Sequence, residues 1–166
     1  MKLDDLPTRS RVFADANVLT YALSTVEPFH SLTSALIERA ARQEIEVFTS
    51  ASQAANVIHR AMIVEAAGRY GLSSSKTLTF LKKHPDSVRS LTRYREIPGE
   101  LSRARVHILD VTYRDIHASK EFRDEYGLLT DDSITLAVMR RHNLVDLATN
   151  DEDFKRIPGI RMWTPY

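Results

Sequence analysis

Aspartates stand at three separated places in this chain, each where an apolar segment gives way to polar residues. They are Asp15, Asp131, Asp132, Asp151 and Asp153. Carboxylates that shared one pocket would repel each other, since two unit charges roughly 4 Å apart cost about 4 kcal/mol at an effective dielectric constant of about 20. A convergent arrangement would therefore require a cation, and oxygen ligands without cysteine suit Mg²⁺ or Mn²⁺. An ion held in this way indicates hydrolysis of a phosphodiester or a phosphoryl group.

Each aspartate also has a structural explanation. Asp15 is of a residue type preferred for capping the helix that follows it, and Asp131 and Asp132 would interact favourably with the dipole at a helix start. Asp151 and Asp153 suit the cap of a short turn. These explanations apply to each residue taken alone, whereas the three places taken together favour a shared site.

Five short apolar segments are predicted to form strands, and helical segments separate them. The strand segments cover residues 11–14, 45–49, 106–110, 145–149 and 160–163. This alternation is typical of an α/β fold in which helices cover both faces of a parallel sheet. Ligands of such sheets bind beyond the carboxyl ends of the strands, at a topological switch point. Asp15 and Asp151 directly follow two of the predicted strands, which is where a ligand would bind.

The helices are predicted from apolar periodicity, capping residues and helix breakers. In chain order they are expected after Asn17 to about Ser24, from Glu27-Pro28 to about 43, from Ser50 or Ser52 to about Tyr70, in pieces over 73–104, over 113–126, and from Thr130 to about His142. Gly71 and Gly127 are expected to end two of these helices, because glycine readily adopts the left-handed conformation there. Pro85 and Pro98 are expected to break the pieces between 73 and 104.

Length and composition limit the class of protein. The 166 residues and 18.9 kDa suit one domain, residues 1–166, with a polar lead-in at 1–10. The absence of cysteine excludes a disulfide scaffold, a zinc ribbon, an iron–sulfur site and a thiol nucleophile. No apolar run reaches the roughly 18 residues of a membrane span, and the start lacks the apolar stretch of a signal peptide. We therefore expect a cytoplasmic protein with no membrane partner.

The charge balance argues against general binding of polyanions. The net charge is +1, so any affinity for nucleic acid must come from local patches. Basic residues gather in the middle of the chain, at Lys82, Lys83, Arg89, Arg93, Arg95, Arg103 and Arg105. Such a segment is a candidate for contact with a phosphate backbone, and a solvated helix face is the alternative interpretation.

Three short segments resemble the ordered motifs of a known family. They read FADANVL at 13–19, GLLTDDSI at 127–134 and LATNDEDF at 147–154. In order and spacing they are similar to the three motifs of PIN domains, and more narrowly to those of the VapC-type toxins of bacterial and archaeal toxin–antitoxin systems. The resemblance spans residues 11–165. It implies a three-layer α/β/α sandwich with a mostly parallel sheet.

The resemblance also implies an activity and a set of site residues. It implies a Mg²⁺- or Mn²⁺-dependent endoribonuclease that hydrolyses RNA, commonly a homodimer that a cognate antitoxin holds inactive. The metal ligands carried over by motif are Asp15, Asp132, Asp151 and Asp153, of which the first three are the catalytic residues. Thr149 orients this cluster through its hydroxyl, and Asn17 supports the loop after the first strand. The basic middle segment would hold the RNA backbone.

One position departs from the family pattern. The family usually has a glutamate early in the helix after the second strand, whereas this chain has Asn56, whose side chain supplies a neutral carbonyl oxygen. Glu65 is a poor substitute, because nine residues correspond to about 180° around a helix. His59 lies on nearly the same face as Asn56, although a lone helical histidine more often has a structural role. Three explanations stay open: a weakened natural nuclease, a reorganised metal shell, or an engineered inactivation.

Two other functions compete with an RNA hydrolase. In the first, Asn56 has removed useful metal affinity, and the chain is a non-catalytic module that binds RNA or a protein partner. In the second, it is a phosphoryl-transfer enzyme on a similar sheet. A haloacid-dehalogenase-like phosphatase needs Asp-x-Asp after its first strand, and this chain has Asp15-Ala16-Asn17. The paired acids and the lysine of a receiver domain are also missing, so the second alternative is disfavoured.

Overall fold

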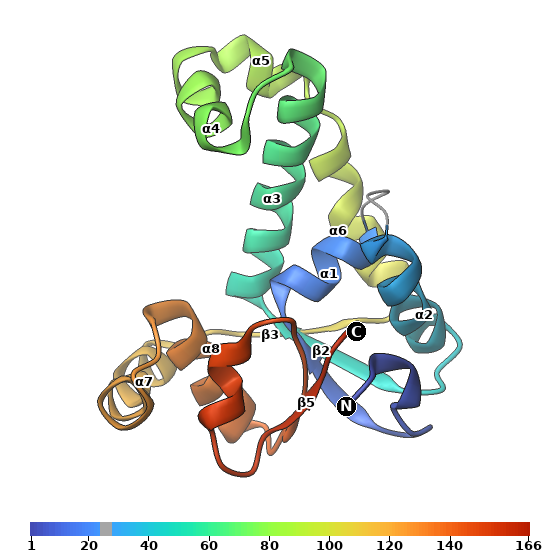
Figure 1. Cartoon of the computed structure of the whole chain (residues 1–166), viewed down its shortest axis with the longest axis vertical. Coiled ribbons are helices and arrows are strands. Elements are labelled where there is room, and N and C mark those ends of the chain that lie inside the picture. The colour runs from blue at the N-terminus through green and yellow to red at the C-terminus, as the bar shows by residue number, and fades with distance from the viewer. Residues whose placement is uncertain (24–27) are drawn as a thin grey trace.

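The computed structural model describes residues 1–23 and 28–166 and has a parallel β-sheet at its centre (Figure 1). Its strands are β1 (Arg11–Ala14), β2 (Glu46–Ser50), β3 (His107–Leu109), β4 (Asp146–Ala148) and β5 (Arg161–Trp163). They lie in the order β3-β2-β1-β4-β5, and every pairing is parallel. The expected α/β fold is therefore confirmed, and no strand boundary departs from its predicted segment by more than one residue.

The sheet is buried on both faces because successive side chains of each strand enter two different cores. In β1, Val12 and Ala14 belong to one core and Phe13 to the other. In β4, Ala148 and Leu147 divide in the same way. All five side chains are fully buried. This double burial explains why the short strands are nearly continuous apolar runs in the sequence.

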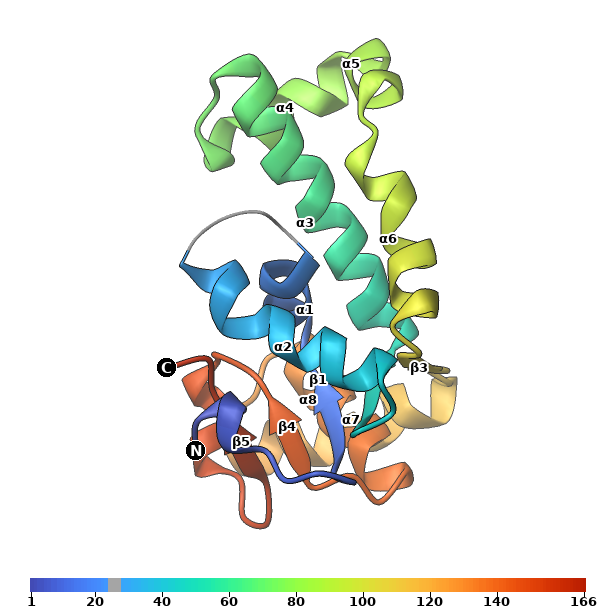
Figure 2. The same ribbon diagram turned by 90° about the vertical axis from the view of Figure 1, so that its right-hand side faces the viewer.

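Helices form the two outer layers. They are α1 (Ala16–Leu23), α2 (Phe29–Ala41), α3 (Ala51–Tyr70), α4 (Ser74–Lys83), α5 (Pro85–Ser90), α6 (Arg93–Arg103), α7 (Tyr113–Tyr126) and α8 (Thr130–Arg141), with the short 3-10 helices η1 (Leu3–Asp5) and η2 (Glu152–Arg156). α1, α2, α3 and α6 pack on one face of the sheet, and α7 and α8 cover the other (Figures 1 and 2). None of the helices in the described part of the chain combines the length and apolar character that a membrane span needs.

α3 and α6 extend side by side away from the sheet and carry α4 and α5 at their far end (Figure 1). We call α4, α5 and the adjoining ends of α3 and α6 the tip. A small core of its own, built around Ala66, Leu81 and Leu91, holds the tip together. The start of α3 therefore lies at the sheet, whereas its end lies in the tip.

Caps and glycines set helix ends where the sequence predicts them. The Ser50 hydroxyl accepts a hydrogen bond from the Gln53 N–H at 3.2 Å and caps α3. Gly71 follows α3 with a φ of +62°, and Gly127 follows α7 with a φ of +65°. Ser24 and Glu27, the expected end of one helix and start of the next, lie outside the described residues.

Pro98 lies inside α6, so the predicted break at this proline is wrong. Proline lacks the N–H that would bond to the carbonyl of Tyr94, and inside a helix it costs about 3 kcal/mol. The neighbouring Ile97 and Leu101 are buried, and each such burial contributes roughly 2 kcal/mol. The buried face of α6 therefore outweighs the missing backbone bond. Pro85 begins α5, where a break is correctly predicted.

The N-terminal segment packs against the rest of the molecule. Leu3 and Leu6 are buried in the core that α1 and α2 share with the sheet. Lys2 forms a parallel β-bridge with Thr164 near the other end of the chain. The polar lead-in thus contributes two apolar side chains to the core. The sequence does not predict this contribution, because single leucines among polar residues form no recognisable pattern.

A buried carboxylate joins the two helices that cover the second face. Asp115, in the first turn of α7, accepts hydrogen bonds from the backbone N–H and the hydroxyl of Thr112, both at 2.8 Å. It also accepts two from Arg141 at the end of α8, at 2.7 and 3.0 Å. Burial raises the pKa of Asp115, but the hydrogen bonds from Arg141 and Thr112 outweigh it and hold the pKa below its usual value. The ionised side chain therefore stabilises the α7–α8 pair.

We predict that Asp115→Ala lowers the free energy of unfolding by about 3 kcal/mol at pH 7, because Arg141 and Thr112 lose their acceptor. The pKa of Asp115 is lower in the folded than in the unfolded chain, so its contribution is complete above the ordinary value of 3.8 and is lost as the pH falls through the folded value. Urea titrations at neutral and at strongly acidic pH should show the difference between the two proteins shrinking in acid. An equal difference at both pH values would contradict this account.

Candidate active site

The order in which the chain adds strands to the sheet reverses next to β1. From β1 the chain continues to β2 and β3 on one side, and it then returns to β4 on the other side. β1 and β4 are adjacent, and Ala14 pairs with Ala148 at their carboxyl ends. A parallel sheet binds ligands at such a switch point. Asp15 and Asp151 follow these two strands, so the structure places both at this edge.

Asp15 is buried, and three donors fix its carboxylate. Oδ1 accepts the N–H of Ala16 at 2.6 Å, and Oδ2 accepts the Asn17 amide at 2.7 Å and the Thr149 hydroxyl at 2.8 Å. Burial raises the pKa of Asp15, and the hydrogen bonds from Thr149 and Ala16 offset part of that effect. The pKa stays above its ordinary value, so burial makes the charged form of Asp15 costly, and a bound cation would offset that cost.

Thr149 connects the ends of β1 and β4. Its fully buried hydroxyl donates to Asp15 and accepts from the Asp151 N–H at 3.0 Å and from the Asn17 amide at 3.2 Å. Oδ1 of Asn17 accepts in turn from the N–H of Asn150 at 3.3 Å. Thr149 and Asn17, both expected to support the site, therefore hold Asp15 and the segment after β4 in one hydrogen-bonded unit.

Asp132 lies half-buried in the first turn of α8. With the residues that the structure describes, its carboxylate forms no hydrogen bond and no ion pair. Burial is the largest cause that raises the pKa of Asp132 to about 6, and the charges of four neighbours follow, namely Asp151, Asp15, Asp153 and Asp131. Aspartates from all three places in the sequence are thus close enough to repel one another.

Asp151 and Asp153 have partners of their own. Oδ1 of Asp151 accepts the N–H of Asp153 at 2.9 Å, so Asp151 caps η2, the structural role that its residue type also suits. The Asp153 carboxylate forms an ion pair with Arg156 at 2.7 Å. Asp153 is therefore partly neutralised by a cation of the chain itself, whereas Asp132 has no such partner within residues 1–23 and 28–166.

The donor set fits a hard divalent cation in its chemistry. Across residues 1–23 and 28–166, no group of three or more histidine, cysteine, aspartate or glutamate side chains is arranged so that it could hold a metal ion without rearrangement. The acidic groups are nevertheless near enough for the charges of Asp151 and Asp15 to add to the effect of burial in raising the pKa of Asp132. All of these donors are oxygens, which suits Mg²⁺ or Mn²⁺. Asp132 could bind an ion without breaking any existing hydrogen bond.

Asn56 lies on α3 and faces α8. Its amide donates to Oδ2 of Asp131 at 3.1 Å. Glu65 cannot take its place, because its carboxylate accepts the backbone N–H groups of Thr92 and Arg93 at the start of α6, at 3.0 and 2.8 Å. His59 lines a hollow between α3 and the helices of the tip. A neutral amide is therefore the side chain that α3 directs at the acidic group on α8.

Gln53 is a residue of the site that sequence reasoning missed. Its side chain is almost fully buried. Oε1 accepts the N–H of Ala16 at 3.0 Å, and Nε2 donates to the Thr135 hydroxyl at 2.8 Å. Gln53 thus ties the start of α1 to α8 through α3. The sequence signal that could have identified Gln53 is its position: it is an amide one turn after the helix cap, on the face that also carries buried Val57.

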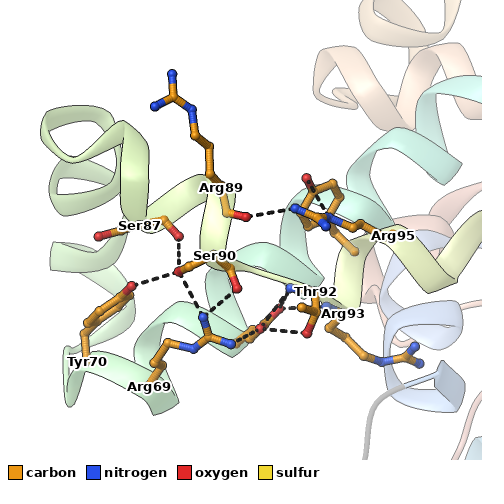
Figure 3. Close-up of polar contacts among 10 residues, drawn as sticks. Arg69, Tyr70, Ser87, Arg89, Ser90, Thr92, Arg93 and Arg95 are labelled. Carbon is orange, nitrogen blue, oxygen red and sulfur yellow. Dashed lines mark hydrogen bonds and ion pairs between the residues drawn. The ribbon is translucent and has the colours of Figure 1, made fainter.

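Several arginines of the basic middle segment are engaged within the tip and α6, as Figure 3 shows in part. Arg89 pairs with Asp86 at 2.6 Å. Arg93 pairs with Glu96 and Glu100, and Arg95 donates to the carbonyl of Arg89. Arg93 also donates to the carbonyl of Leu23 at the end of α1. The prediction that this segment holds RNA therefore gains no support from these three arginines.

The fold and the position of the site define a class of protein. The family model described as PIN domain matches residues 12–160, and the chain belongs to the PIN domain family. The chain is also 27% identical over 155 residues to Ribonuclease VapC2 of Methanocaldococcus jannaschii, which covers 92% of this chain and 93% of that protein. The resemblance to PIN domains and VapC-type toxins carried by the three motifs is thereby confirmed.

Solved structures share the fold. A toxin–antitoxin complex from Klebsiella pneumoniae has a chain that superposes with a TM-score of 0.57 at 21% identity, covering 93% of this chain and 98% of that one. VapC20 from Mycobacterium tuberculosis, described as a Sarcin-Ricin loop cleaving toxin, gives a TM-score of 0.55 at 15% identity, covering 89% and 95%. At these identities the likeness concerns the three-layer architecture.

We predict that Thr149→Val destabilises the protein by about 2 kcal/mol, because it preserves shape but removes the hydroxyl that serves Asp15, Asp151 and Asn17. Thr149→Ser keeps the hydroxyl and should cost less than about 1 kcal/mol, mainly from the lost methyl group. Urea unfolding of both variants measures the difference. Equal losses for valine and serine would show that packing, and not the hydrogen bonds, makes this residue important.

Proposed function

We propose that this chain is a Mg²⁺- or Mn²⁺-dependent endoribonuclease that hydrolyses RNA and acts as the toxin of a toxin–antitoxin pair. One observation carries the proposal: Asp132 has no partner among the described residues although it lies next to other aspartates at the switch point of the sheet. Membership of the PIN domain family and the similarity to a protein named Ribonuclease VapC2 support it.

In this proposal Asp15, Asp132 and Asp151 are the catalytic residues and hold the ion, and Asp153 is an accessory ligand. When bound, a divalent ion polarises a phosphoryl oxygen and makes water a better nucleophile. The supporting residues keep the acids in place, since Thr149 and Asn17 both donate to Asp15. Asp15 is therefore held by hydrogen bonds in the absence of substrate, whereas Asp132 forms none with the described residues.

Asp132→Asn should lower the rate of RNA cleavage by more than about 100-fold, because it removes a proposed ligand of the ion. Without metal the same variant should be more stable than the wild type by about 1 kcal/mol at pH 7, since it removes a charge that its neighbours repel, in part screened by solvent. Gel assays on total cellular RNA with millimolar Mn²⁺, and urea titrations in EDTA, measure the two effects.

Asp86→Asn is the matched control for this experiment. It removes an exposed carboxylate in the tip, with a side chain 92% exposed, and should retain cleavage. Cleavage by Asp132→Asn at the wild-type rate would refute the assignment of Asp132. A gain in stability together with a loss of cleavage would show that the variant is folded and that the carboxylate itself is required.

Asn56 is the position at which we propose that activity is weakened. Its amide donates to Asp131, so a carboxylate there would add a charge about 3 Å from an existing one. Asn56→Glu should therefore destabilise the metal-free protein, increase the rise in melting temperature caused by Mn²⁺, and raise cleavage by roughly 10-fold or more. Thermal melts with and without Mn²⁺ and the cleavage assay measure these changes.

Asn56→Gln is the neutral control, and it should not gain metal stabilisation. If Asn56→Glu gains neither metal stabilisation nor activity, α3 does not lack a ligand. The metal shell would then be organised without α3, which is the second explanation for the departure at this position.

The alternative function is a PIN module that binds RNA or a protein partner without cleaving. Two contacts favour it, because the Asn56–Asp131 hydrogen bond and the Asp153–Arg156 ion pair already satisfy part of the acidic group. Calorimetric titration with Mn²⁺ separates the two functions. No heat at millimolar metal, together with intact RNA binding, would support the module and reject the metal-dependent nuclease.

The proposed partners follow from the relatives. Solved structures with this fold include toxin–antitoxin complexes, and we propose that a cognate antitoxin inhibits this chain. We further propose that the chain acts as one domain over residues 1–166, forms a homodimer, and works in the cytoplasm where its RNA substrate is present. Co-expression with the neighbouring gene product and sizing of the purified complex would test the partner and the oligomeric state.

A further inference from the structure

Arg60 stands next to the acidic site on the exposed side of α3. It follows Asn56 by four residues, so the two side chains lie one turn apart on the same face of the helix. Asn56 itself contacts Asp131 at the start of α8. Arg60 is therefore about one helical turn from a contact that borders the acidic group.

The charge of Arg60 reaches the centre of the site. Burial is the largest influence on Asp15 and raises its pKa, and the charge of Arg60 is among the effects that lower it. The guanidinium nevertheless touches no carboxylate: with the residues that the structure describes it forms neither a hydrogen bond nor an ion pair. Arg60 thus affects the site electrostatically while all of its donors stay available.

Other basic residues near the acidic segments are already engaged. Arg156 pairs with Asp153, and Lys155 pairs with Glu152. Arg123, in the last turn of α7, donates to the hydroxyls of Ser119 and Ser133. If Arg60 served to neutralise the acidic group itself, we would expect it to form an ion pair with one of these carboxylates. Exposed Asp131, which contacts Asn56 one helical turn before Arg60, would be the nearest candidate. The unpaired state of Arg60 is instead suited to an anion that arrives from solution.

We propose that Arg60 binds a backbone phosphate of the RNA strand beside the acidic site. This inference rests on the proposed function. A guanidinium presents a planar fork of donors that matches phosphate, and it stays charged at any physiological pH. A near-neutral protein does not attract RNA through its net charge, and the acidic site repels it. A phosphate contact with Arg60 would hold the RNA strand beside this site.

The test measures RNA binding separately from cleavage. Arg60→Gln, Arg60→Lys and Lys76→Gln are each made in an Asp132→Asn background, where cleavage is expected to be absent. Lys76 is an exposed lysine of α4 in the tip and serves as the charge-matched control. Fluorescence polarisation with a short labelled single-stranded RNA, in EDTA and over a KCl series, gives the affinity and its salt dependence.

Arg60→Gln should weaken binding several-fold at low salt and reduce the slope of log K against log[salt] by about 0.7, the value for one lost phosphate contact on a single strand. Arg60→Lys should keep the slope, and Lys76→Gln should change neither quantity. An unchanged slope in Arg60→Gln, with RNA binding intact, would overturn the proposal and leave the proposed nuclease unaffected. Absence of RNA binding by the Asp132→Asn parent would overturn the role of Arg60, and the cleavage assay with Mn²⁺ would then decide on the nuclease separately.

A kinetic readout distinguishes substrate contact from a structural role. In the protein with Asp132 intact, Arg60→Gln should raise KM with little change in kcat, because a phosphate beside the reacting bond is held equally before and during the reaction. A fall in kcat with unchanged KM would contradict the proposal. If the slope changes as expected but the wild-type chain cleaves no RNA, the proposed role of Arg60 in RNA binding is supported and the proposed cleavage activity is rejected.

Discussion

The hydrogen bond from Thr149 to Asp15 joins the carboxyl ends of two adjacent parallel strands, and the arrangement of the acidic residues depends on it. The two residues are 134 positions apart in the chain. Because a hydroxyl both donates and accepts, Thr149 also receives the N–H of Asp151 and fixes the next acid. Gln53 extends the connection to α8 through Thr135. A few buried polar side chains thus position groups from β1, β4 and α8 in a region where an unpaired donor would be costly.

Charge is unevenly compensated across this region. Arg156 pairs with Asp153, and the Asn56 amide bonds to Asp131, so the two outer acids have partners. Asp15 is held by neutral donors, and Asp132 has no partner among the described residues. The outer acids of the group therefore each have a partner, whereas Asp132 has none among the described residues. Burial and, after it, the charges of the neighbouring aspartates raise the pKa of Asp132, and a cation that binds here would relieve the repulsion among those charges.

The sequence predicted the strands and most helix ends well, because each depends on local signals: double burial makes short apolar runs, and Gly71 and Gly127 take the left-handed conformation that ends a helix. It failed at Pro98, where burial of Ile97 and Leu101 outweighs a local rule. Local patterns placed the acidic residues at strand and helix ends, and the topology brought them to one edge. The pairing of Asn56 with Asp131, and of Gln53 with Thr135, depends on how α3 packs against α8, which no periodicity encodes.

The length of α3 separates two tasks along a single helix. Its first turns carry Gln53, Asn56 and Arg60 near the acidic group, whereas Glu65 accepts four hydrogen bonds from the segment that begins α6 and one from Arg69. A carboxylate with so many donors is committed to the tip, so a change at Asn56 cannot be compensated by moving this acid toward the sheet. The acid that Asn56 does contact comes from α8, a different element. The charge of the site on this side is therefore set by the packing of α3 against α8 and by the guanidinium of Arg60, one turn further along.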